Sequence, residues 1–198
     1  MSYVVLPSSP APMIIEPQQI DYGGVLSPPL GGTDQRVNRN GNRWALRIQM
    51  PLMEEPEAGL WVGALTRGQR YGVRLPLIQA DVNIGIPGSP LVNGSGQAGD
   101  TLNIKGMASG YDLVAGQWFN HVSGGFNYLY KIALPGKAIG LGTVTATIEP
   151  PLRAETTDNE VLEFEEPVIE GLLVGQGQGW TIDAAIHTGL SFTIRERR

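Results

Sequence analysis

Residues that could carry out catalysis are few in this chain and lie far apart. The 198 residues include no cysteine and two histidines, His121 and His187, and neither histidine has a spacing typical of metal ligands. No serine stands beside a recognisable base. We therefore predict no catalytic residue, no metal site, no cofactor and no disulfide, and we expect structural or surface roles for both histidines.

Carboxylate pairs are another route to catalysis, because glycoside hydrolysis uses two acids about 5 to 9 Å apart across a cleft. The candidate acids are Glu163, Glu165 and Glu166, with Asp100, Asp112 and Asp183 scattered elsewhere. Glu163 and Glu165 alternate with apolar residues, as they would on the solvated face of a strand. We favour that interpretation, predict that the protein is not an enzyme, and keep a glycan hydrolase as the weakest alternative.

Aromatic residues gather around Gly124-Gly125, at Trp118, Phe119, Phe126, Tyr128 and Tyr130. Aromatic rings can stack on the apolar faces of sugars, so Trp118, Phe119, Tyr128 and Tyr130 are candidate carbohydrate-binding residues. Alternating aromatics on short strands more often form the core of a small barrel. We favour the barrel core and keep the sugar platform as an alternative.

Two glycine-rich stretches lack the spacing that their chemistry would need. Gly94-Ser95-Gly96 is not a nucleophile elbow, because that motif has its glycines two residues from the serine. Residues 175–179 are followed by a strand-like segment at Trp180, whereas a phosphate site needs a helix behind the glycines. We predict a turn and a flexible connector.

Composition predicts a β-rich scaffold. The 27 glycines and 15 prolines together exceed a fifth of the chain, which favours many turns and few long helices. Prolines break the apolar pieces of residues 1–32, which we expect to form extended arms or edge strands on their own domain or on a neighbouring subunit. We predict no secretion signal and no membrane span.

The charge of the chain argues against a general nucleic-acid surface. The net charge is -5, and the one basic cluster is Arg195, Arg197 and Arg198 at the C-terminus, interrupted by Glu196. We expect this terminus to be a frayed, solvated end.

Residues 36–70 carry the clearest local signals. Asn40-Gly41 suits the positive φ angles of a tight two-residue hairpin turn. In residues 43–50, Trp44, Leu46, Ile48 and Met50 alternate with other residues and predict one apolar strand face.

A helix is expected over about residues 56–67. Pro56 suits the first helical position, and Gly68 is placed to end the helix. Its apolar stripe is predicted to pack on the sheet that carries Trp44. The stripe consists of Leu60, Trp61, Ala64 and Leu65.

The remaining pattern predicts a mainly β fold in two units. Residues 1–90 and 151–198 would form a discontinuous β-sandwich domain, and residues 91–150 an inserted, barrel-like small β domain. Residues 80–99 are turn-rich. Strands are expected at residues 71–77, 101–104, 117–122, 128–133, 143–148, 161–164, 168–174 and 190–194.

A series of motifs extends over residues 36–170. The first are Arg39-x-Gly41-x-Arg43-Trp44, Met50-Pro51-x-Met53 and Leu65-x-Arg67-Gly68-Gln69. Next come Val92-Asn93-Gly94-x-Gly96-Gln97-x-Gly99-x-Thr101-Leu102, Gly116-Gln117-Trp118-Phe119 and Leu129-Tyr130-Lys131-Ile132. The last is Glu149-Pro150-Pro151-Leu152-Arg153, followed by Phe164 and Pro167. In this order and spacing they resemble the distal tail, or tail-tip, proteins of long-tailed bacteriophages.

The resemblance implies a structural virion component of the tail tip, or baseplate, assembled in the cytoplasm of the host bacterium. Six copies would form a ring that joins the tail tube to the hub and host-recognition apparatus and encloses the DNA channel. The implied partners are other copies of the chain, the tail tube protein and hub or fibre proteins, with the tape measure protein left open. No specific nucleic acid recognition is implied. The alternative is a carbohydrate-binding module that contacts the host cell surface.

Overall fold

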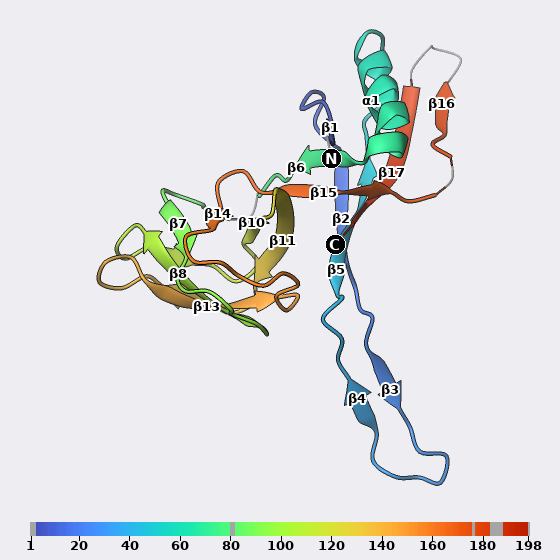
Figure 1. Ribbon diagram of the computed structural model, residues 1–198. Helices are drawn as coiled ribbons and strands as arrows, with labels where there is room; N and C mark the ends of the chain where they lie inside the picture. The colour runs from blue at the N-terminus through green and yellow to red at the C-terminus, as the bar shows by residue number, and fades with distance from the viewer. Residues whose placement is uncertain (1–2, 80–81, 176, 183–187, 198) are drawn as a thin grey trace.

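The computed structural model describes residues 3–79, 82–175, 177–182 and 188–197. Within these ranges the protein is mainly β, with one helix, one seven-stranded sheet and a closed six-stranded barrel (Figure 1). This confirms the predicted fold class. The helix α1 is neither long enough nor apolar enough to cross a membrane.

The sheet brings together strands from both ends of the chain. One edge is β1 (Val4–Val5) and the other is β2 (Ile14–Ile20), so the N-terminal segments are edge strands, as predicted. Among the described residues, β2 is paired on one side alone, by β5. The order is β1, β6 (Val73–Pro76), β15 (Val168–Leu173), β17 (Thr188–Glu196), β5 (Arg43–Gln49) and β2, and β16 (Trp180–Ile182) pairs with β17.

The two faces of this sheet differ sharply. Alternation in β5 and β17 buries Trp44, Leu46 and Ile48 together with Leu190, Phe192 and Ile194, which confirms the predicted strand faces. The opposite face is polar and exposes Arg47, Gln49, Ser191 and Arg195.

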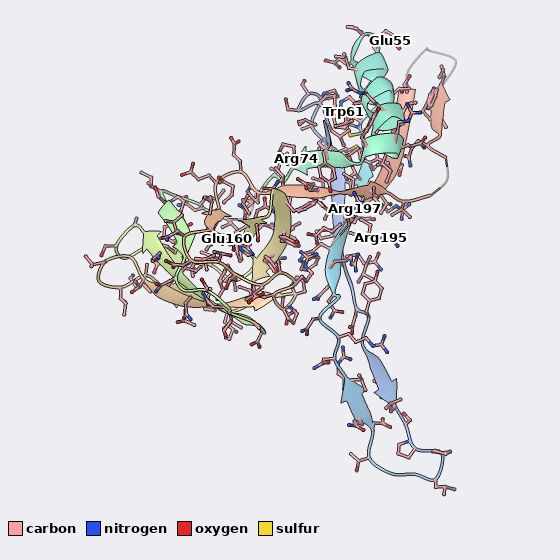
Figure 2. The ribbon with its side chains drawn as sticks, in the orientation of Figure 1. Glu55, Trp61, Arg74, Glu160, Arg195 and Arg197 are labelled. Atoms are coloured by element: carbon pink, nitrogen blue, oxygen red, sulfur yellow. The ribbon has the colours of Figure 1, made fainter. Side chains whose placement is uncertain are left out.

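Helix α1 (Glu57–Tyr71) covers the apolar face of the sheet. Trp61 is fully buried, with its ring centre 6.1 Å from that of Phe192 (Figure 2). The predicted apolar stripe was partly wrong, because Leu60 is exposed and the buried residues are Ala58, Trp61, Leu65 and Gly68.

The predicted end of the helix was also wrong. Gly68 lies inside the helix against Val73, where a Cβ atom would come within 2.2 Å of Val73 Cγ1. The helix ends at Gly72, whose φ of 83° lies in the left-handed region that favours glycine. Gly68 is thus required for close packing rather than for termination.

The barrel closes in the order β10, β11, β13, β8, β7 and β14. Four of its strands confirm the predictions within a few residues: β8 (Thr101–Met107), β10 (Trp118–Ser123), β11 (Phe126–Ile132) and β13 (Val144–Glu149). β7 (Gly88–Val92) lies within residues 80–99, so the stretch predicted to be turn-rich also contains a barrel strand that was not predicted. With β14 (Val161–Glu163), the barrel strands extend from Gly88 to Glu163. A short pair, β9 (Asp112–Leu113) and β12 (Gly136–Lys137), lies beside them.

A long ribbon leaves the sheet as a projecting arm, which we define as residues 21–42. It contains β3 (Gly24–Leu26) and β4 (Gln35–Val37), and Figure 1 shows it extending away from both the sheet and the barrel. The ribbon turns at residues 27–34.

Asn40-Gly41 is therefore not a tight hairpin, and that prediction was wrong. Neither residue has a positive φ, and the flanking strands β4 and β5 pair with β3 and β2 rather than with each other. Residues 38–42 face the shorter segment 21–23, so Asn40-Gly41 forms a bulge in one strand of the ribbon. The reason is that β5 is already paired on both sides, by β2 and β17.

Candidate functional site

The four candidate sugar-binding aromatics are all buried. Phe119 and Tyr130 are 0% exposed, and Tyr128 and Trp118 are 8% and 9% exposed. Phe119, Tyr128 and Tyr130 belong to the barrel core, as the favoured interpretation predicted. Phe119 stacks between Tyr130 and Phe164, with ring centres 5.7 and 4.8 Å away. Buried rings cannot present a face to a sugar, so this arrangement does not favour a sugar platform.

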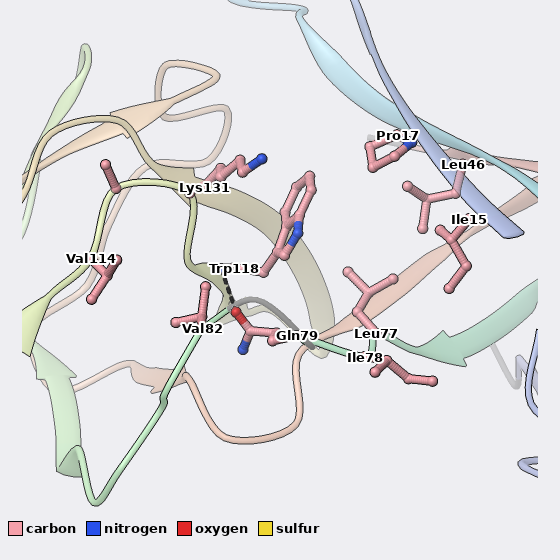
Figure 3. A pocket seen from close by; sticks show the side chains of 12 residues that line it. Ile15, Pro17, Leu46, Leu77, Ile78, Gln79, Val82, Val114, Trp118 and Lys131 are labelled. Atoms are coloured by element: carbon pink, nitrogen blue, oxygen red, sulfur yellow. Dashed lines mark hydrogen bonds between the residues drawn. The ribbon is translucent and has the colours of Figure 1, made fainter.

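Trp118 lies outside that core, where the barrel meets the sheet. Its ring meets Trp44 edge-on at 4.7 Å, and Lys131 Nζ lies 4.7 Å from its centre. Trp118 and Lys131 form one side of a pocket of about 430 Å³, and Ile15, Pro17 and Leu46 lie across from them (Figure 3).

The amide group of Gln79 in this pocket is bonded to the protein itself. Gln79 Oε1 accepts the backbone N–H of Trp118 at 2.7 Å, and Gln79 Nε2 donates to the Phe164 carbonyl at 3.0 Å. The pocket therefore combines apolar walls with the charged side chain of Lys131.

The candidate acids that the structure describes do not converge on a cleft. Glu163 Oε1 accepts the backbone N–H groups of Glu165 and Glu166 at 2.8 and 3.1 Å, which shapes the turn after β14. Asp112 pairs with Lys137 at 3.0 Å on the exposed β9–β12 pair. Asp100 is exposed. Asp183 and His187 lie outside the described residues.

His121 is buried in the barrel wall and bonded to a carboxylate. Its Nε2 lies 2.7 Å from Glu160 Oε2, which also accepts the Thr157 N–H at 2.8 Å. Burial opposes ionisation, but hydrogen bonds from Ser123, Thr157 and His121 together lower the pKa of Glu160 below its ordinary value. Among the described residues, no three His, Asp or Glu side chains are grouped so that they could hold a metal ion.

The glycine-rich stretches serve as turns and connections. Gly94 and Gly96 have φ angles of 98° and 73° in the turn between β7 and β8, and Ser95 Oγ accepts the Asp158 N–H at 2.9 Å. Gly175 follows β15, and Gln176 lies outside the described residues.

The most extensively bonded polar cluster is a buried ion pair between sheet and barrel. Glu196 in β17 accepts from Arg153 Nη2 at 2.8 Å and Nη1 at 3.0 Å. It also accepts the backbone N–H groups of Trp44 in β5 and Leu129 in β11, at 2.7 and 2.9 Å. The Arg153 and Glu196 side chains are 4% and 2% exposed. One carboxylate thus joins two strands of different units.

The Arg153 guanidinium is surrounded by bonding groups. It lies over the rings of Tyr128 and Tyr130, 5.5 and 5.2 Å from their centres, and donates to the Leu129 carbonyl at 3.1 Å. Burial opposes its charge, but Glu196 raises the pKa of Arg153 above its usual value. Burial raises the pKa of Glu196, and Arg153 opposes that shift. We call Arg153, Glu196, Tyr128 and Tyr130 the junction.

Two further contacts fix the barrel against the sheet. Asn120, fully buried in β10, donates to the Val168 carbonyl at 2.9 Å and accepts the Val168 N–H at 2.6 Å. Glu170 Oε2 accepts from Arg74 at 2.6 Å and from Asn127 at 2.8 Å. The barrel is therefore attached to the sheet by several polar bonds across a buried surface.

The expectation of a frayed C-terminal end was wrong for Arg195 and Glu196. Both lie in β17, whose residues pair as far as Glu196. Extending the alternation of Leu190, Phe192 and Ile194 by two residues would have placed Glu196 on the buried face. Arg195 is exposed, and Arg198 lies outside the described residues.

The arm contrasts with this buried cluster. Leu26 and Leu30 are 61% and 97% exposed, and the ion pair between Arg36 and Asp21 lies on its surface. The arm contributes no residue to either hydrophobic core.

Comparison with known proteins adds no relative. No protein-family model matches the chain, and no curated protein matches it significantly.

Proposed function

We propose that this protein is a structural component of the tail tip of a long-tailed bacteriophage. Six copies would form a ring that joins the tail tube to the hub and host-recognition apparatus and surrounds the DNA channel. Its partners would be other copies of the chain, the tail tube protein and the hub or fibre proteins. The motifs between Arg39 and Pro167 suggest this function.

The projecting arm is the observation that best supports the proposal. A two-stranded ribbon without a core is at best marginally stable in water. The arm exposes Leu26 and Leu30 and lies away from the rest of the chain (Figure 1). A segment of this kind gains most of its stability by lying on a neighbour. An assembly component has such a neighbour, whereas an isolated enzyme or binding module does not need one.

The sheet offers a second feature suited to assembly. Strand β2 leaves one edge without a described partner, and unpaired edges are templates for strands of other chains. The polar face beside it, which carries Arg47, Gln49 and Ser191, is suited to a water-filled channel. A rigid body with an open edge and an arm can form a closed ring of copies.

We also propose that the protein makes and breaks no bond in a substrate. Support comes from Glu163, whose carboxylate is bonded to backbone N–H groups, and from the burial of the barrel aromatics. A ring component needs contact surfaces rather than a reactive cleft.

Electron microscopy tests the proposal directly. The purified full chain should form rings with a central channel, alone or when mixed with tail tubes. Immunogold labelling of intact tailed particles with an antibody against this chain should mark the end of the tail. Label that is absent from the particles, or spread along the tail tube, would contradict the proposal.

A further inference from the structure

An exposed apolar groove lies at one end of the sheet. Its volume is about 730 Å³, within the range of about 300 to 1,000 Å³ typical of binding pockets. Trp180 is 47% exposed, Met13 59% and Leu52 66%. None of the described residues that line the groove is charged. We call it the Trp180 groove; its apolar lining consists of Met13, Met50, Pro51, Leu52, Trp180 and Leu190.

The end of the arm has matching chemistry. We define the tip as residues 26–33, which read Leu-Ser-Pro-Pro-Leu-Gly-Gly-Thr and contain no charge. The Gly31 N–H donates to the Pro28 carbonyl at 3.2 Å, so the tip is a turn that projects Leu30 into solvent. Two prolines restrict this turn, which lowers the entropy lost when it is held by a partner.

The tip and the groove of one chain lie at opposite ends of the same ribbon. Strand β5 begins at Arg43, next to the arm, and ends at Gln49, which lines the groove. Its seven residues alone span about 20 Å at about 3.3 Å per residue. The arm continues from the Arg43 end of β5 and extends away from the sheet (Figure 1). The tip of a chain therefore does not reach the groove of the same chain, and docking of the tip there would involve another copy.

Charge does not oppose such a contact between copies at the tip and the groove. Each copy has a net charge of -5, so copies repel one another weakly at long range. An uncharged tip against an uncharged groove adds no repulsion and buries exposed leucines against Trp180. Each chain has one tip and one groove, so the contact is heterologous and joins copies head to tail.

We propose that the tip of each copy docks in the Trp180 groove of the next copy. This inference rests on the proposed ring function, because it names the surface through which the ring would close.

Cysteine cross-linking tests this contact in the full chain, which has no cysteine of its own. One variant carries Ser27→Cys in the tip and another carries Thr181→Cys beside Trp180; both residues are exposed. Under mild oxidation, mixing the two should give disulfide-linked dimers roughly a hundredfold faster than Ser27→Cys mixed with Ser95→Cys, because docked thiols reach millimolar effective concentrations. Ser95 is an exposed control on the barrel.

The outcomes separate this inference from the proposed function. If rings form in the microscope but the Ser27→Cys and Thr181→Cys mixture links no faster than the control, the docking contact is wrong and the ring stands. If the mixture links rapidly but the copies form only open chains and label no tail, the ring function is wrong and the docking contact stands. A double variant with both cysteines in one chain should give a ladder of linked species; monomer alone would overturn the docking.

Discussion

The junction and the arm differ in how deeply their side chains are buried and in how many bonds they make within the chain. At the junction, Glu196 bonds to Trp44 in β5, Leu129 in β11 and Arg153, and its side chain is 2% exposed. In the arm, Leu30 is 97% exposed and the polar pairs are on the surface. The two regions belong to one chain, yet one is complete by itself and the other is not.

This difference separates a region that specifies the fold of the chain from a region that would serve contacts with other chains in the proposed ring. A buried polar cluster is costly unless all of its members are bonded, so the junction tolerates little variation in the relative position of sheet and barrel. The arm has no comparable constraint within the chain. Substitutions in the junction should therefore change mainly the stability of the fold, whereas substitutions in the arm should change mainly assembly.

The largest effect is expected from Glu196→Ala. It would leave the Arg153 guanidinium buried without its carboxylate and should lower the free energy of unfolding by about 3 to 5 kcal/mol. Urea unfolding followed by tryptophan fluorescence measures this loss. Glu196→Gln keeps the shape of the side chain and gives a second measurement if the alanine variant fails to fold.

The matched control is Glu16→Ala in the same sheet. Glu16 lies 3.8 Å from Arg47, with side chains 60% and 71% exposed. Exposed pairs contribute about 0 to 1 kcal/mol, so this variant should unfold nearly as the parent does. Equal losses of unfolding free energy for Glu16→Ala and Glu196→Ala would show that the buried ion pair at the junction contributes no more to stability than an exposed ion pair does.

A smaller effect is expected where the helix packs on the sheet. Gly68→Ala places a methyl group within 2.2 Å of Val73 Cγ1 in the core and should cost about 1 to 3 kcal/mol through overpacking. Gly63→Ala, in the same helix with open space around its Cα, should stabilise the protein by about 0.5 to 1 kcal/mol. Thermal unfolding of both variants checks the sign. If both variants are stabilised, Gly68 is not closely packed against Val73.

Features that depend on neighbouring residues were predicted from the sequence, and contacts between residues far apart in the chain were missed. Alternation located β5 and β17 because a half-buried strand repeats every two residues. Short segments between glycines, spaced about ten residues apart, located β8, β10 and β13. The prediction failed at Asn40-Gly41, because the partners of β5 lie far away in the chain. The bond between Arg153 and Glu196 joins residues 43 positions apart, and no local pattern connects them. Gly68 resembled a helix end because sequence does not reveal what packs against a glycine.

A pH-dependent effect is expected at the barrel wall. The pKa of Glu160 is lower in the folded protein than its ordinary value of 4.5. The folded state thus binds this proton less readily than the unfolded state. The stability from the ionised carboxylate is complete above pH 4.5 and is lost as the pH falls through the lower folded pKa. Glu160→Gln should make unfolding less dependent on pH in this acidic range.

Unfolding in urea at several values of pH below 5 measures this change. Glu165→Gln, which removes an exposed carboxylate after β14, is the control and should keep the parent profile. A parent-like profile for Glu160→Gln would mean that the contact with His121 contributes nothing measurable.

The smallest effect on folding, and the clearest effect on assembly, is expected from Leu30→Ser. Its side chain is 97% exposed, so the free energy of unfolding of the monomer should change by less than about 0.5 kcal/mol. Self-association should weaken, because the leucine would no longer bury its surface on a neighbour. Light scattering over a concentration series measures the association, and urea unfolding of the same preparations measures the fold. Leu60→Ser, an exposed leucine on α1, is the control and should leave association unchanged. If Leu30→Ser lowers stability as much as Gly68→Ala does, the arm belongs to the folded body, and the contrast with the junction is wrong.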